Sequence, residues 1–405
     1  MRNDKLAAIP SLLREINERS ALDTLRRQGS LHAAEIARLI GVSKPTTSEI
    51  LRSLVENGLV RELTPGEDDS KRARTMYEAV PDTKVTVGID IGSRFIRAAV
   101  GDLNGKSLAE VSRPTSSLAL KQILSDISAT VKSALTESGY ALKDVAAVAV
   151  GTPGVVDQLT GKVAIAGTIG SLDGVNLAQE IKKLFKCAPI VENDINLVTV
   201  AEQGAGFGRD VANFAVLSVG SGLGSGLVLN GALHRGHRGA AGEIFYVPFG
   251  DPHDRARSAT NPSGDRIAEL TRSLASQYKK STLAEPYSTI DILDAAKKGD
   301  QLASAVVSLE AERIALYIGA LSAVADVELV VLSGGIGRQA NFFIEPIRAL
   351  VGEILPYPPR IEVSQLGDRG ILVGALQLAT AQACDSVFAA RNRDHQLSQP
   401  ARNIS

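Results

Sequence analysis

The chain has 405 residues, of which 44% are hydrophobic and 22% are charged, and its formal net charge at pH 7 is −1. This length predicts more than one domain, because single hydrophobic cores stop growing at about 250–300 residues. Two cysteines exclude a disulfide framework, and the balanced charge excludes a bulk attraction to nucleic acid. No apolar run approaches a membrane span of about 18–20 residues and no apolar signal core opens the chain, so we expect a cytoplasmic protein without membrane partners.

Residues 21–58 are predicted to form a helix-turn-helix. Apolar side chains follow a helical period in three segments, and Gly41 lies in the short turn between the second and the third. Ser43 suits the N-cap of the third helix, Pro45 its first turn and Gly58 its end. Small polar residues at a helix N-terminus can approach base edges and phosphates in the major groove. We therefore expect contacts to double-stranded DNA from Ser43, Lys44, Thr46, Thr47, Ser48 and Arg52.

A two-stranded wing is predicted over residues 59–80, where two apolar segments flank a polar turn. The tip of this wing would contact phosphates or the minor groove through Lys71, Arg72 and Arg74. The acidic segment at 66–70 (GEDDS) opposes that contact. The alternative is a helical module for protein contacts with a solvated run of charges. Pro81 marks the domain boundary, so residues 1–81 form the expected winged helix-turn-helix domain.

From residue 84 onward, strands and helices alternate. Three consecutive strands precede a helix at about 117–139 and a fourth strand, which is not the order of a doubly wound sheet and predicts an α/β ribonuclease-H-like lobe. A glycine-rich hairpin at 213–236 opens a second set of strands and helices. The expected limits are about 82–200 plus the C-terminal helix for one lobe, about 201–365 for the other, and 386–405 for a disordered tail. We expect a ligand between the two lobes of this 82–385 domain.

Seven motifs occur in the two-lobed region in a fixed order. They are GIDIG (88–92), GTPGVVDQLTGKV (151–163), ENDINLVTVAEQGAG (192–206), VGSGLGSGLVLNG (219–231), RGAAGEI (238–244), LSGGIG (332–337) and LGDRGILVGA (366–375). Together they make residues 84–385 resemble the ROK family of repressors, open reading frames and sugar kinases. With the winged helix in front, the whole chain is similar to the sugar-responsive repressors of that family. The resemblance implies the actin-like, two-lobed fold of the sugar-kinase superfamily.

The resemblance also implies a sugar site. In ROK kinases the aspartate that matches Asp194 is the base that takes a proton from a sugar hydroxyl. The asparagine that matches Asn193 binds sugar hydroxyls, and Glu243 matches a second sugar-binding carboxylate. A carboxylate that accepts from a hydroxyl gives a strong hydrogen bond with or without catalysis. An Asx turn that ends a strand is the alternative for Asn193 and Asp194. Tyr246 replaces the family's zinc-binding and sugar-binding histidine, and Thr168 replaces an asparagine, so the expected effector is a sugar or sugar phosphate but not necessarily glucose.

Two family features are damaged. The zinc-binding cysteines are missing after Tyr246, and His253 with Asp254 is too small a ligand set, so we expect no zinc. The loop over 251–265 would then be mobile until ligand binds, or pinned by Arg255 and Arg257. In the first phosphate loop Ser93 and Arg94 replace Gly-Thr and crowd the backbone, so ATP is not an expected cofactor. The vestigial nucleotide-binding residues are Asp90, Gly92, Gly222, Gly224, Gly334 and Gly335, although tight turns also require glycine.

These patterns predict a sugar-responsive DNA-binding regulator, by the family's common mode a repressor of carbohydrate uptake and catabolism genes. Its homodimer or tetramer would bind a palindromic operator, and the effector would change operator affinity. One alternative is an active sugar kinase that carries a DNA-binding domain and uses Asp194 as its base. Another is a ligand-free constitutive repressor whose body only dimerises.

Overall fold

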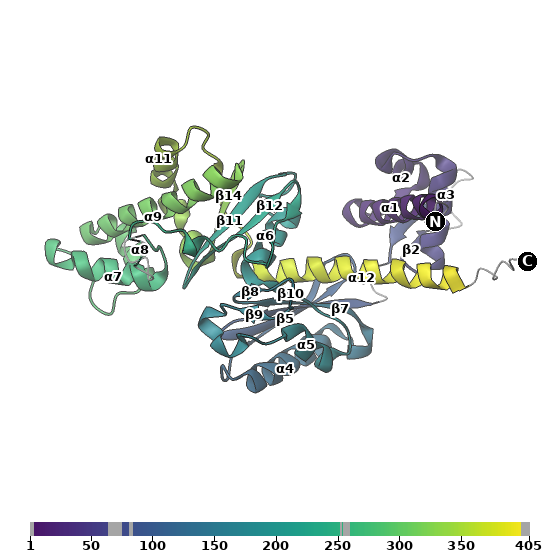
Figure 1. Cartoon of the computed structure of the whole chain (residues 1–405), viewed down its shortest axis with the longest axis horizontal. Coiled ribbons are helices and arrows are strands. Elements are labelled where there is room, and N and C mark those ends of the chain that lie inside the picture. The colour runs from purple at the N-terminus through teal and green to yellow at the C-terminus, as the bar shows by residue number, and fades with distance from the viewer. Residues whose placement is uncertain (1–3, 64–74, 81–83, 252, 254–259, 398–405) are drawn as a thin grey trace, which may run out of the picture.

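Three bodies follow one another along the chain in the computed structural model, which describes residues 4–63, 75–80, 84–251, 253 and 260–397. Figure 1 shows the N-terminal helical domain, a first lobe beneath the long helix α12 (Gly370–Leu397), and a second lobe beside the start of that helix. Within the described residues, no helix combines the length and the apolarity that a bilayer crossing needs.

The N-terminal domain is a winged helix-turn-helix. Its helices are α1 (Asp4–Gln28), α2 (Ala33–Ile40) and α3 (Lys44–Glu56), and its antiparallel sheet has the order β1 (Leu31–His32), β3 (Met76–Ala79), β2 (Val60–Leu63). Leu22, Leu25, Ile36 and Leu54 are almost fully buried at the centre of its core. The helix-turn-helix prediction is confirmed, but α1 begins well before residue 21 and β1 adds a third strand.

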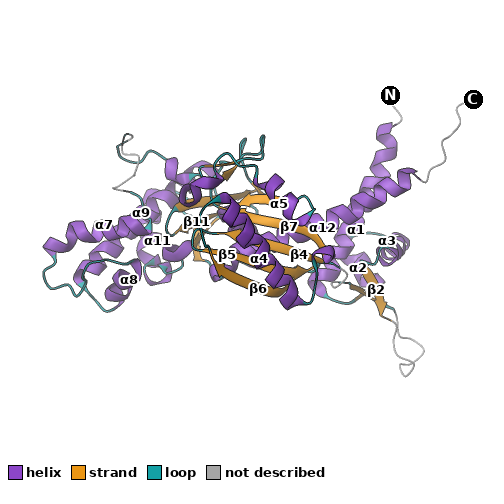
Figure 2. Ribbon diagram, turned by 90° about the horizontal axis from the view of Figure 1, so that it is seen from below, coloured by secondary structure: helices purple, strands orange, loops and turns teal. Residues whose placement is uncertain are grey.

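The first lobe is built on a five-stranded sheet. Its order is β10 (Ile190–Asn193), β7 (Val145–Thr152), β4 (Val85–Ile91), β5 (Phe95–Asp102), β6 (Ser107–Pro114). The first three strands of this lobe, β4, β5 and β6, form an antiparallel meander, and β7 and β10 join in parallel. Helices α4 (Leu120–Ser138) and α5 (Leu177–Phe185) cover one face and α12 covers the other (Figure 2). A small ribbon of β8 (Val155–Val156) and β9 (Val163–Ala164) lies outside the sheet.

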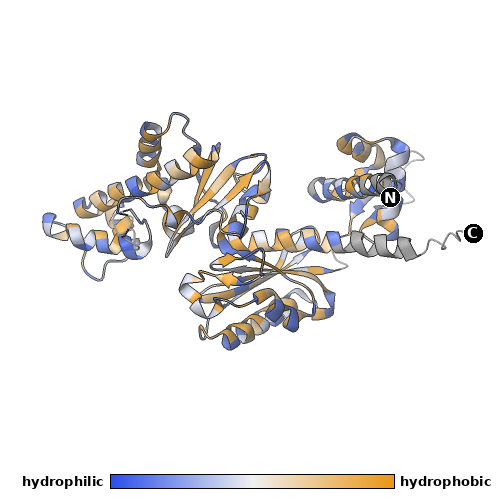
Figure 3. Ribbon diagram, in the orientation of Figure 1, coloured by the Kyte–Doolittle hydropathy of each residue, from blue (hydrophilic) through white to orange (hydrophobic). Residues whose placement is uncertain are grey.

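The second lobe repeats this topology. Its sheet has the order β15 (Arg360–Val363), β14 (Leu329–Ser333), β11 (Phe214–Val219), β12 (Leu223–Leu229), β13 (Ala232–Leu233). The helices are α7 (Gly264–Leu274), α8 (Thr289–Lys297), α9 (Gln301–Ala325), α10 (Gly334–Gly337) and α11 (Ile344–Ile354). Apolar strands lie inside each lobe and polar residues mark the outer faces of the helices (Figure 3). The repeated meander followed by parallel strands confirms the predicted two-lobed, sugar-kinase-like fold class.

Two helices connect the parts. Helix α6 (Asp194–Ala205) packs against α12 and against β11 and β12 of the second lobe. At their crossing a Cβ on Gly374 would lie 1.9 Å from the Leu197 carbonyl oxygen, so only glycine fits there. Helix α12 continues to Leu397, and the expected disordered tail is therefore wrong over residues 386–397. Polar composition alone did not reveal that this segment continues an established helix.

Candidate functional site

Asn193 and Asp194 lie at the junction between β10 and α6. The Asn193 Oδ1 accepts from the backbone N–H of Ile195 at 2.8 Å and of Asn196 at 3.1 Å, which caps α6. Its Nδ2 donates to the Gly154 carbonyl at 2.9 Å. Both ends of this amide therefore hold the local structure, as in the Asx-turn alternative, and contact with a ligand stays a prediction for Asn193.

Asp194 begins α6 and is the electrostatic centre of the site. Burial raises its pKa to about 7, and the negative charges of Asp90 and Glu243 add to that rise, while the Ile195 N–H opposes it. Asp90 lies on β4 of the first lobe, and Glu243 lies before the short turn Ile244–Tyr246 of the second lobe. The site thus combines carboxyl groups from both lobes, with Asp194 and Glu243 within electrostatic range of each other.

Asp90 is held by an arginine that the sequence analysis missed. Arg97 on β5 donates to the Asp90 Oδ2 from Nε at 2.9 Å and from Nη2 at 2.7 Å. The two residues lie directly opposite each other in the β4–β5 ladder. Pairing these two consecutive strands in the sequence would therefore have predicted this ion pair. Burial raises the pKa of Asp90 to about 6, although Arg97 lowers it. The carboxylate is therefore already engaged within the chain.

A strap over residues 234–243 joins the second lobe to the first. Arg235 Nε donates to the Glu192 Oε2 at 2.5 Å, and Arg238 Nη1 donates to the Asp157 Oδ2 at 2.9 Å. Gly242 has a φ of 89°, and a Cβ there would lie 2.1 Å from the Ser225 carbonyl oxygen. Only glycine can therefore place the following Glu243, whose pKa is raised by burial. His234 and His237 are exposed.

Thr168 and Tyr246 lie at the surface of this region. Thr168 is exposed in the turn Gly167–Leu172, and Tyr246 is 53% exposed, so both residues are open to solvent. Ile165, which no sequence pattern singled out, has a φ of 56° and is 51% exposed in the same loop. A β-branched residue in this left-handed region is strained, and such strain collects at functional sites. No sequence signal reports a single backbone angle of this kind.

The glycine-rich turns divide into two groups. Gly334 has a φ of 80° and its Cβ would lie 2.4 Å from the Val219 carbonyl oxygen, and a Cβ on Gly92 would lie 2.8 Å from the Phe95 carbonyl oxygen. A Cβ on Gly224 would lie 3.3 Å from Ile195. At Gly222 and Gly335, by contrast, a Cβ would meet nothing within 4 Å. Packing against backbone therefore accounts for glycine at Gly334 and Gly92, whereas Gly222 and Gly335 leave open a ligand role.

The residues present do not fit the zinc site of the family. Cys187 follows α5, Cys384 lies on α12, and His253 and Tyr246 lie apart from both in the chain. Among the residues that the structure describes, no three His, Cys, Asp or Glu side chains form a group that could hold a metal ion. Asp254 and the predicted anchors Arg255 and Arg257 lie outside the described residues.

Helix α3 exposes one polar face. Lys44, Ser48 and Arg52 are exposed at intervals of one helical turn. Ser43 is the N-cap, and its Oγ accepts from the Thr46 N–H at 3.3 Å and lies 2.7 Å from the Thr46 hydroxyl. Thr47 is completely buried and its hydroxyl donates to the Ser43 carbonyl at 3.0 Å, so its assignment to the DNA-contacting set is wrong. The wing residues Lys71, Arg72 and Arg74 lie outside the described residues.

A sequence profile of the ROK family matches residues 86–382, which is more than half of the chain. The chain belongs to the ROK family. A profile of the IclR helix-turn-helix domain matches residues 20–63 of this ROK protein, in agreement with the helices in front of the two lobes.

ROK relatives of two kinds are similar to this chain. The xylose repressor of Caldicellulosiruptor bescii is 23% identical over 388 residues, covering 91% of this chain and 96% of the relative. The glucokinase of Halalkalibacterium halodurans is 27% identical over 280 residues, covering 65% of this chain and 83% of the relative. A crystal structure of a ROK family transcriptional regulator, described as a homologue of the E. coli MLC protein, superposes with a TM-score of 0.80 at 20% identity. It covers 94% of this chain and 98% of its own, and supports the fold of all three bodies.

Proposed function

We propose that this ROK protein is a sugar-responsive, DNA-binding transcriptional repressor. The observation that carries the proposal is the presence, in one chain, of an exposed polar face on α3 and a cluster of carboxyl groups shared between two lobes. The face suits a recognition helix, and the carboxyl groups suit the hydroxyls of a sugar. The repressor relative aligned over nearly its full length supports the same pairing of functions.

The charges of the site favour a neutral sugar over a sugar phosphate. The electrostatic environment of Asp194 already includes Asp90 and Glu243, and a phosphate next to the hydroxyl that Asp194 holds would add like charge. Three arginines of the neighbouring segments are paired with carboxylates: Arg97 with Asp90, Arg235 with Glu192 and Arg238 with Asp157. Hydroxyl groups can donate to the carboxylates without this penalty. The effector class we infer is therefore an uncharged monosaccharide.

The DNA ligand we infer is a palindromic double-stranded operator bound by a homodimer or tetramer. Two copies related by a two-fold axis present two matching α3 helices, so half-sites would be about one or more helical turns apart. Effector binding would change the relative placement of the two α3 helices and reduce operator affinity. Genes for carbohydrate uptake and catabolism are the inferred targets.

Kinase activity is the alternative, and Asp194 favours it because a carboxylate with a pKa of about 7 is suited to general base chemistry. Two features oppose it. Arg97 already engages Asp90, and the exposed Arg94 follows Ser93 in the turn where ROK kinases have Gly-Thr. We infer that the protein responds to its sugar without phosphorylating it and needs neither ATP nor zinc.

The proposal is tested with an operator selected by the full-length protein from random double-stranded DNA. Fluorescence anisotropy would measure operator affinity with a panel of neutral pentoses and hexoses and with hexose 6-phosphates. We expect at least one neutral sugar to weaken binding and the phosphates to have no effect. A response confined to phosphates would contradict the effector class, and ADP release with ATP and the active sugar would favour the kinase.

A further inference from the structure

Helix α12 touches every part of the molecule that the proposed function requires. It starts between the lobes, crosses the sheet of the first lobe and reaches the DNA-binding domain (Figure 1). We propose that α6 and α12 transmit effector binding to the DNA-binding domain, and that Gly374, Arg19, Arg26 and Asp385 are the positioning residues of this path. This inference rests on the proposed function and specifies how its two sites communicate.

The path begins at Asp194, because this effector-site residue is the first residue of α6. Helices α6 and α12 meet at backbone distance at Gly374, where a Cβ would lie 1.9 Å from the Leu197 carbonyl oxygen. A Cβ on Gly204 of α6 would lie 2.5 Å from the Gln377 Nε2 of α12. With so little space between the two helices, displacement of α6 must displace α12.

The turn before α12 is tied to both lobes. In this turn, Gly367–Arg369, the Asp368 carbonyl accepts a hydrogen bond from Arg97 Nη1 at 2.8 Å. The other nitrogens of Arg97 bind the Asp90 carboxylate. The Asp368 carboxylate pairs with Arg338 of the second lobe, and Arg369 pairs with Glu110 of the first lobe. The base of α12 therefore contacts the effector-site carboxyl cluster through one arginine and both lobes through ion pairs.

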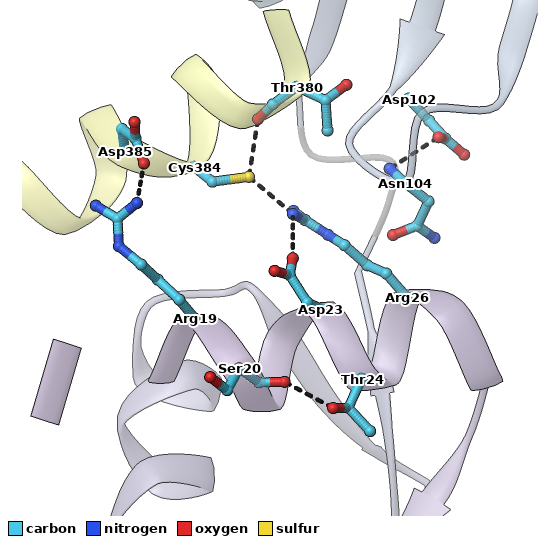
Figure 4. Close-up of polar contacts among 10 residues, drawn as sticks. All are labelled: Arg19, Ser20, Asp23, Thr24, Arg26, Asp102, Asn104, Thr380, Cys384 and Asp385. Atoms are coloured by element: carbon cyan, nitrogen blue, oxygen red, sulfur yellow. Dashed lines mark hydrogen bonds and ion pairs between the residues drawn. The ribbon is translucent and has the colours of Figure 1, made fainter. Parts of the chain in front are cut away.

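The middle of α12 contacts α1. Asp385 pairs with Arg19, and the Cys384 Sγ lies 2.8 Å from Nη1 of Arg26, a side chain that is 11% exposed (Figure 4). The Cys384 side chain packs against the core of the DNA-binding domain. One residue earlier, Ala383 packs into the first lobe. Since the same turn of α12 is fixed on one side to the first lobe and on the other to α1, it sets the orientation of α1 and of the α3 helix packed on α1.

These contacts explain how closure of the lobes can reach DNA. A sugar held between Asp194 and Glu243 draws the second lobe toward the first, and the tied turn and α6 carry that displacement into α12. The orientation of α1 then changes, and with it the spacing of two α3 helices in a dimer. A bistable element whose equilibrium both ligands bias is what allosteric coupling requires.

The experiment compares full-length variants at both ends of the path. Arg19→Asp, Asp385→Arg and the charge-swapped double variant are titrated with the selected operator, with and without D-xylose, and D-xylose affinity is measured separately by calorimetry. We expect each single variant to keep its xylose affinity within about twofold and to lose roughly threefold or more of the xylose effect on operator affinity. The swap should restore the effect, which a merely structural loss would not allow. An unchanged xylose effect in both single variants would overturn the proposal.

A second arm needs no effector. Gly374→Ala forces α6 and α12 apart, whereas Gly352→Ala on α11 places its Cβ in open space and serves as the matched control. We expect Gly374→Ala to change operator affinity at least about fivefold relative to Gly352→Ala, with thermal unfolding confirming that both fold. Should the wild type bind no xylose, D-xylose is excluded as the effector while this arm still decides the path. Equal operator affinity in the two folded glycine variants would contradict the path.

Discussion

At the scale of single residues, the site depends on carboxyl groups whose pKa values are shifted by their surroundings. Asp194 has a folded-state pKa of about 7 against an ordinary value of 3.8, so the folded protein retains a proton that the unfolded chain releases. Stability from this group is therefore full at acid pH and falls as the pH rises toward 7. Ionisation of Asp194 lowers the stability of the fold, but the ionised carboxylate accepts a hydrogen bond from a hydroxyl more strongly.

Effector affinity should follow the same titration with the opposite sign. Because a sugar hydroxyl binds the ionised carboxylate more strongly, we expect affinity to rise between pH 6 and 8 and then to level off. Calorimetry at several pH values measures this rise and the proton released on binding. Asp194→Asn should lose about 1.5–3 kcal/mol of binding free energy and reduce the pH dependence of sugar affinity. A variant with wild-type affinity would remove Asp194 from the site.

The Asp90–Arg97 pair predicts a pH-dependent loss of stability. Arg97→Leu leaves Asp90 buried without its guanidinium, and breaking a buried pair costs about 3–5 kcal/mol. The cost should be smaller at pH 5, because Asp90, with a pKa of about 6 even beside Arg97, is then largely protonated in the folded state of both proteins. Urea unfolding at pH 5 and 8 gives the two values. Equal losses at both pH values would mean that the charge of Asp90 is not what Arg97 stabilises.

At the scale of elements, α3 separates an exposed face from a buried one. Lys44→Ala and Arg52→Ala should each weaken operator binding and reduce its salt dependence, since each removes a cation from the exposed face. Thr47→Val should instead act on stability through the buried hydroxyl that bonds to Ser43. Anisotropy at two salt concentrations and thermal unfolding distinguish these effects. A loss of DNA affinity in folded Thr47→Val equal to that of Lys44→Ala would contradict the division into faces.

Helix α3 also shows that helix boundaries can be predicted from the sequence, whereas the burial of a small polar residue cannot. Capping residues and helical periodicity predicted α3 almost to its boundaries, because Ser43 and Pro45 act locally. The helical period also places Thr47 on the face of α3 that carries the apolar positions. Whether a small polar residue on that face is buried depends on the helices that pack against it. The extension of α12 beyond residue 385 was missed for a related reason, since the polar residues there give no core-facing pattern.

At the scale of the whole molecule, the duplicated sheet topology was predictable and the contacts between bodies were not. The order of strands and helices along the chain determines each lobe, because consecutive strands pair and parallel strands need crossovers. Asp194 and Glu243 could be grouped only through the family resemblance, since they come from different lobes. Long-range pairs such as Arg19 with Asp385 lie hundreds of residues apart and have no local signal.

The central claim is that one chain links a sugar between its lobes to operator DNA at α3. The most direct measurement is the operator affinity of the full-length protein with and without saturating neutral sugar, in the wild type and in Asp194→Asn. We predict a loss of affinity of about 5–150-fold in the wild type, and a smaller loss in the variant at a sugar concentration that only just saturates the wild type. An operator affinity that no neutral sugar changes would contradict the account. So would an Asp194→Asn protein whose operator affinity falls with sugar as much as that of the wild type.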